Sequence, residues 1–143
     1  VIELHFRWAA NAECRWSDVS LAAIGAPAPR NVTLAAVHYI PRDGKTADDS
    51  RRQFAPFVAE AAAKGADLVV LPETLTCTGN GLTYLDAAEP VPGPSTEYFG
   101  ALAKEHGLYI VAGIVERDAH LIYNVAILMA PDGSLAGSYR KVT

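Results

Sequence analysis

The chain has 143 residues, of which half are apolar and a fifth are charged, and its formal net charge is −4. This length allows one domain with a buried core, and this composition excludes an intrinsically disordered chain. The negative charge, without a basic stripe to neutralise phosphates, argues against a nucleic-acid partner. The longest apolar runs, at residues 68–71 and 109–115, are too short to cross a bilayer, so we predict no membrane span.

The first thirty residues predict strands rather than a signal peptide. Polar and apolar residues alternate over residues 1–8, as in a half-buried strand, and residues 14–21 can return as a second strand. We therefore predict an N-terminal β-hairpin, with a linker at residues 25–30. A hairpin of this size is not stable alone, so we expect residues 1–24 to end an upstream all-β module. The chain lacks an initiator Met, and we expect it to be a segment of a longer protein.

From residue 31 apolar runs alternate with amphipathic stretches. Residues 32–40 are almost wholly apolar, which predicts a strand covered on both faces. A helix follows and ends near Gly65, which suits the left-handed position after a helix. Its capping candidates are Thr46, Asp48 and Asp49, and its apolar face gathers Phe54, Phe57, Val58, Ala61 and Ala62. Residues 69–71 are the next predicted buried strand, and residues 74–92 are a long loop rich in Thr, Gly and Pro.

The rest of the chain predicts a helix, a strand and a hairpin. The helix begins at Gly93-Pro94-Ser95, ends at Gly107 and carries Phe99, Leu102, Ala103 and His106 on one stripe. Residues 108–115 are a third buried strand. Residues 121–129 and 135–139 flank Pro131-Asp132-Gly133, a strong turn signal, and so predict a β-hairpin. The order from residue 31 indicates a layered α/β domain with a mixed sheet.

Two side chains at strand ends are candidates for chemistry. Glu73 follows a buried strand and Pro72, at the edge of an α/β sheet where ligands bind. Lys141 follows Arg140 at the end of another strand. Each has a plain alternative: Glu73 could cap a turn or pair with an arginine, and Lys141 could be one of the many lysines exposed to solvent. Position alone supports both interpretations of Glu73 about equally, whereas for Lys141 it favours an exposed lysine.

Other polar residues give weaker signals. Cys77, four residues after Glu73, could be a nucleophile if deprotonated, but a buried structural thiol is the favoured interpretation. Cys14 is interpreted as structural, and the two cysteines, which match no metal spacing, could be free or disulfide-bonded. The four histidines lack ligand spacing, so we predict no metal site. Asn124 is interpreted as structural, with a smaller chance that it steadies a neighbouring site.

A set of short segments, taken together, resembles the carbon–nitrogen hydrolases of the nitrilase superfamily. The resemblance covers residues 31–143, and the order and spacing of its pieces hold over more than a hundred residues. The matching segments are Val69-Val70-Leu71-Pro72-Glu73, Pro92-Gly93-Pro94, residues 103–113, Glu116-Arg117, Tyr123-Asn124, Pro131-Asp132-Gly133 and Tyr139-Arg140-Lys141. Residues 15–21 lie outside this domain and look like the last strand of a β-sandwich module.

The resemblance implies an α-β-β-α sandwich, of which residues 31–143 are the N-terminal half, paired with a second subunit. It also implies a Glu-Lys-Cys triad in which Glu73 is the general base and Lys141 is the lysine. The family's cysteine and a further glutamate are expected beyond Thr143. Cys77 does not match the position of the nucleophile, so the resemblance gives it no catalytic role.

The resemblance therefore implies a hydrolase that cleaves a non-peptide carbon–nitrogen bond of an amide, carbamoyl amine or nitrile through a thioester. We expect this segment alone to be inactive. The alternative is a non-catalytic member that keeps the fold for binding or assembly. We expect no cofactor, a small-molecule substrate and a homo-oligomer. The compartment stays open, because the family core is often cytoplasmic whereas an attached β-sandwich suits an exported protein.

Overall fold

The computed structural model describes residue 4 and residues 10–142, which fall in two units, Val1–Arg30 and Asn31–Thr143. In the first unit residues 10–30 are exposed and contain no helix or strand. The predicted second strand of the hairpin, residues 14–21, is therefore wrong. Its apolar side chains bury no common face, since Trp16 and Leu21 are 53% and 81% exposed, and a strand needs such cover. The predicted first strand lies, apart from Leu4, outside the described residues.

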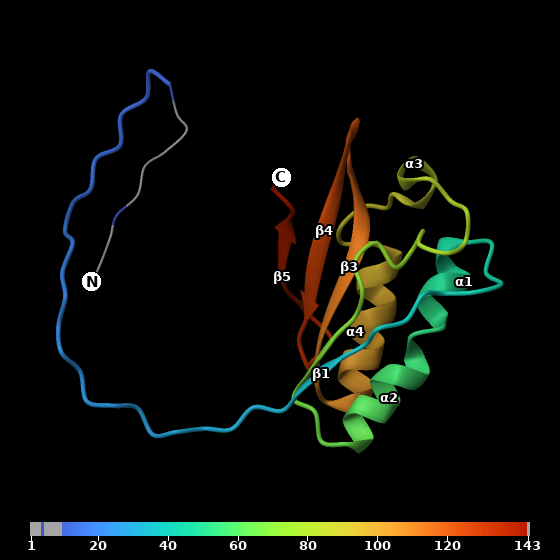
Figure 1. The fold of residues 1–143 in the computed structure, drawn as a ribbon, viewed down its shortest axis with the longest axis horizontal. Helices are drawn as coiled ribbons and strands as arrows, with labels where there is room; N and C mark the ends of the chain where they lie inside the picture. Colours follow the sequence, from blue (N-terminus) through green and yellow to red (C-terminus); the bar gives the residue numbers. More distant parts are fainter. Residues whose placement is uncertain (1–3, 5–9, 143) are drawn as a thin grey trace. The chain divides into compact units, whose positions relative to one another are not determined.

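The second unit is built on one mixed sheet of five strands. These are β1 (Leu34–Ala36), β2 (Leu68–Val70), β3 (Tyr109–Asp118), β4 (Leu121–Met129) and β5 (Leu135–Arg140). The strands lie side by side in chain order, with β1, β2 and β3 parallel and β3, β4 and β5 antiparallel (Figure 1). The α/β class, the mixed sheet and the hairpin of β4 and β5 are confirmed. No helix in the part of the chain that the structure describes is long and apolar enough to cross a membrane.

Four helices accompany the sheet: α1 (Ala47–Arg52), α2 (Ala55–Ala63), α3 (Tyr84–Ala87) and α4 (Pro94–His106). The single helix predicted before Gly65 is in fact α1 and α2. Pro56 stands in the first turn of α2, where its missing N–H breaks the hydrogen-bond ladder of a continuous helix. Thr46 caps α1 through a capping box, and Gly65 has a φ of 75°, as predicted. The predicted loop at residues 74–92 contains α3.

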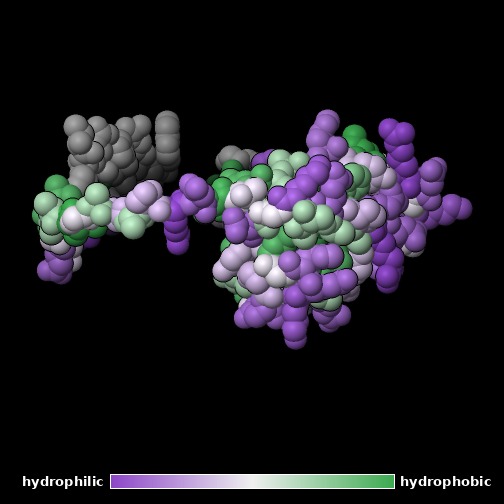
Figure 2. All heavy atoms as spheres, turned by 90° about the horizontal axis from the view of Figure 1, so that it is seen from below, coloured by the Kyte–Doolittle hydropathy of each residue, from purple (hydrophilic) through white to green (hydrophobic). Residues whose placement is uncertain are grey.

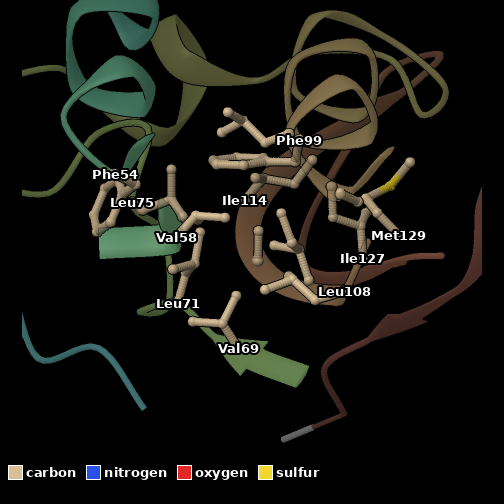
Figure 3. Close-up of a cluster of buried hydrophobic side chains, with 14 of the residues drawn as sticks. Phe54, Val58, Val69, Leu71, Leu75, Phe99, Leu108, Ile114, Ile127 and Met129 are labelled. Carbon is tan, nitrogen blue, oxygen red and sulfur yellow. The ribbon is translucent and has the colours of Figure 1, made fainter. Parts of the chain in front are cut away.

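The main core lies between one face of the sheet and helices α2 and α4. Phe54 and Val58 from the α1–α2 segment, with Phe99 from α4, meet strand residues such as Ile114 and Ile127, and all five are fully buried (Figure 3). Hydrophilic side chains cover much of the surface of this unit in the view of Figure 2. The helices therefore cover one face of the sheet, which we call the helical face.

The opposite face, which we call the open face, is only partly covered. Cys77 and Ala87 pack on Val115 at one end of it. Elsewhere apolar strand side chains are exposed: Leu34 by 67%, Val70 by 39% and Tyr139 by 63%. Val32 and Ile40, which lie before and after β1, are each 55% exposed. The prediction that residues 32–40 form a strand covered on both faces is therefore wrong for the described chain. Only Leu34–Ala36 form β1, and the helices shield just one of its sides.

Candidate active site

Glu73 lies in the turn that follows β2, and the main chain of β3 holds this turn in place. Gly113 of β3 donates its N–H to the Pro72 carbonyl over 3.2 Å, and its own carbonyl accepts the N–H of Leu75 over 2.9 Å. A Cβ at Gly113 would lie 2.5 Å from the Cα of Glu73, so only glycine permits this approach. Thr74 has a φ of 49°, uncommon for a β-branched residue, as the chain turns away. The glutamate is thus fixed against the middle of the sheet.

Lys141 directly follows β5, and its neighbour Arg140 anchors that strand end. The Arg140 guanidinium donates two hydrogen bonds of 2.7 Å to Glu116 and one of 2.8 Å to Asp118, and it lies 4.0 Å from the centre of the Tyr123 ring. Successive residues of a strand point to opposite faces. Arg140 is therefore tied to β3 and β4 on one face, and Lys141 extends toward the other.

The two candidate residues meet although they are 68 positions apart. The Lys141 Nζ donates to the Glu73 Oε1 over 3.0 Å, and the Asn124 Nδ2 donates to the same oxygen over 2.6 Å. These hydrogen bonds from Lys141 and Asn124, together with the lysine charge, lower the pKa of Glu73. The side chains of Glu73 and Lys141 are 57% and 54% exposed in this chain. Glu73 is therefore held as a solvent-accessible carboxylate beside an ammonium.

The pair lines a cavity of about 290 Å³ on the open face. Apart from Glu73, Asn124 and Lys141, its lining is apolar or small: Val70, Leu71, Val111, Gly113, Val125, Ala126 and Tyr139. A carboxylate and an ammonium in such surroundings can exchange protons with a bound molecule and stabilise negative charge on it. Among the described residues no group of three or more His, Cys, Asp or Glu side chains is arranged to hold a metal ion.

Neither cysteine lines this cavity. Cys77 is buried, packs on Ala87 and Val115, and donates its S–H to the Thr74 carbonyl over 3.4 Å. Burial raises the pKa of the Cys77 thiol, which disfavours the nucleophilic thiolate. Its interpretation as a buried structural thiol agrees with this position. Cys14 is an exposed free thiol in the first unit.

Two further residues, which the sequence marks only weakly, contribute to the site. Asn124, interpreted mainly as structural, contacts Glu73 directly. Gly113 appeared only within a matching segment, yet it allows the Glu73 turn to approach β3. A signal existed for Asn124, since an amide between the apolar residues of a predicted strand is unusual. Gly113 gave a similar signal, because glycine inside a strand often marks the close approach of another backbone.

Comparison with known proteins identifies the family. Residues 14–143 match the family model described as carbon-nitrogen hydrolase, and this match begins inside the stretch predicted to be an upstream module. The boundaries predicted for domains stay predictions.

Among curated proteins, the chain is similar to omega-amidase NIT2 of Homo sapiens, with 39% identity over 87 residues, which are 60% of this chain and 32% of that protein. It is 41% identical over 96 residues to omega-amidase NIT2 of Mus musculus, covering 66% and 34% of the two chains. The chain thus spans about a third of the length of these relatives.

Solved structures show the same fold. Nit3 of Saccharomyces cerevisiae, a member of branch 10 of the nitrilase superfamily, superimposes with a TM-score of 0.63 at 25% identity, covering 78% of this chain and 44% of that one. A carbon-nitrogen hydrolase from Helicobacter pylori superimposes with a TM-score of 0.61 at 23% identity, covering 78% and 40%. The predicted nitrilase-type fold is confirmed, and the chain belongs to the carbon–nitrogen hydrolase family.

Proposed function

We propose that the protein containing this chain hydrolyses a carbon–nitrogen bond, with Glu73 and Lys141 acting on a cysteine supplied by sequence beyond Thr143. The observation that supports this most strongly is the 3.0 Å contact between Lys141 and Glu73 at the rim of the cavity. The family match supports the class of reaction. The names of the curated relatives, omega-amidases, favour an amide over a nitrile as substrate.

In the first half of the proposed reaction, Glu73 accepts the thiol proton and the cysteine sulfur attacks the amide carbon. The pair of electrons in the carbonyl double bond moves to oxygen, and the Lys141 ammonium stabilises the resulting negative charge. Glu73 then gives its proton to the leaving nitrogen, the carbon–nitrogen bond breaks, and ammonia or an amine departs. A thioester remains on the cysteine.

In the second half, Glu73 removes a proton from water while the water oxygen attacks the thioester carbon. Lys141 again stabilises the oxyanion, the carbon–sulfur bond breaks, and the proton returns to the sulfur. Glu73, whose pKa is lowered by Lys141 and Asn124, is ionised near neutral pH and can therefore accept a proton, although the lower pKa makes it a weaker base.

Glu73→Gln tests this proposal in the full-length protein, assayed with small primary amides. Glutamine keeps the size of the side chain but cannot take a proton, so kcat should fall by about 10²–10⁴-fold. Because Glu73 is exposed in this chain, the unfolding midpoint should change little. Glu105→Gln, which removes an exposed carboxylate on α4, is the matched control and should retain activity. Equal activity in the wild type and Glu73→Gln would overturn the proposal.

A further inference from the structure

Asn124 links the two strand ends that carry the candidate pair. It lies on β4, opposite Val115 of β3. Its side chain donates to Glu73 over 2.6 Å, and its carbonyl accepts the N–H of Lys141 over 2.8 Å. One residue therefore contacts the Glu73 carboxylate through its side chain and the Lys141 main chain through its backbone.

We propose that Asn124 is a positioning residue that holds Glu73 by Oε1 and leaves Oε2 as the oxygen that exchanges protons. This inference rests on the proposed function, because it assigns Asn124 a part in the same reaction. Both donors, Asn124 and Lys141, bind Oε1, and among the described residues no hydrogen bond reaches Oε2. The orientation of the carboxylate is thus set on one side, and the other side stays free for the thiol or water.

The chemistry of an amide suits this role. The Nδ2 group of Asn124 donates a hydrogen bond but does not titrate near neutral pH, so it can orient Glu73 without competing for its proton. Among the described residues, Lys141 after β5 is the charged group that lowers the pKa of Glu73, while β3 contributes Gly113 at close approach. Asn124 is therefore the uncharged one of the two side chains that donate hydrogen bonds to Glu73.

A purely structural role explains Asn124 less well. It lies on an interior strand of the sheet, where asparagine is a poor strand former. The next residues on the same face of β4, Ala126 and Leu128, are apolar. The one hydrogen bond described for its side chain goes to Glu73. Its backbone hydrogen bond with Lys141 does not depend on the side chain, so any residue that leaves the strand undistorted would keep it.

Asn124→Ala in the full-length protein tests the inference by two readouts, the pH profile of kcat/KM and the carboxyl NMR titration of Glu73. The Asn124 hydrogen bond favours the ionised carboxylate, so its loss should raise the pKa of Glu73 and move the acid limb of the profile to higher pH. At a pH below this limb, kcat/KM should fall below that of the wild type, because a smaller fraction of Glu73 is then ionised. Asn124→Asp adds a like charge beside Glu73 and should move both curves further in the same direction.

The matched control is Gln53→Ala, which removes another half-buried amide. The side chain of Gln53 accepts hydrogen bonds from Tyr39 and Arg42, and neither of these residues lines the cavity at Glu73. It should leave both pH curves in place even if it lowers stability. If the wild type cleaves amides but Asn124→Ala shifts neither curve, or only raises KM, the inference fails and the proposed function stands. If no amide is cleaved while the Glu73 titration moves, the proposed function fails and the positioning of Glu73 stands.

Discussion

The helical face and the open face of the same sheet use similar strand residues in different ways. On the helical face Ile110, Ile114 and Ile127 are fully buried beneath α2 and α4. On the open face Val70 and Tyr139 remain 39% and 63% exposed, beside the cavity that holds the Glu73–Lys141 pair. From this difference in burial we predict that the helical face supplies most of the stability, while the open face presents polar groups carried by the ends of strands.

The largest expected effect on stability comes from emptying the helical face. Phe99 on α4 is fully buried, so Phe99→Ala in the 143-residue chain should lower the free energy of unfolding by about 3–5 kcal/mol. Denaturant unfolding measures this change. Tyr139→Ala on the open face is the control and should change it by about 0.5 kcal/mol or less. Equal losses for both variants would contradict the contrast between the faces.

A smaller effect on stability is expected at Gly113 of β3, where the Glu73 turn approaches the sheet most closely. A Cβ there would lie 2.5 Å from the Glu73 Cα, so Gly113→Ala should cost about 1–3 kcal/mol of stability by overpacking. It should also lower the proposed amidase activity of the full-length protein, because the Glu73 turn must move. Gly137→Ala on β5 is the matched control, since no atom lies within 4 Å of its added Cβ. Normal activity in Gly113→Ala would show that the close approach does not position Glu73.

Local patterns predicted much of the fold. The hairpin of β4 and β5 was predicted closely, because a strong turn signal at residues 131–133 separates two apolar strands. The break between α1 and α2 was missed, although Pro56 marks it, because the apolar spacing continues across the break. Exposure of the open face could not be predicted from hydrophobic runs, which look alike whether one or both faces are covered.

The arrangement of the candidate site was harder to predict than the individual residues that form it. Glu73 and Lys141 each stood at a predicted strand end, and the family resemblance paired them. Their 3.0 Å contact, however, depends on the order of the strands and on the close approach at Gly113, which no local pattern encodes. The double role of Asn124 depends on the register between β4 and the end of β5, which becomes visible only once those strands are paired.

The most direct test of the central proposal is to locate the residue that carries the acyl group during the reaction. The proposal is that Glu73 and Lys141 act on a cysteine beyond Thr143. The full-length protein is mixed with an amide substrate, quenched in acid and digested, and the acylated residue is located by mass spectrometry. We predict an acyl group on a cysteine beyond Thr143, and less of it in Glu73→Gln. An acyl group on Cys77, or turnover of the amide with no acylated cysteine, would contradict the account.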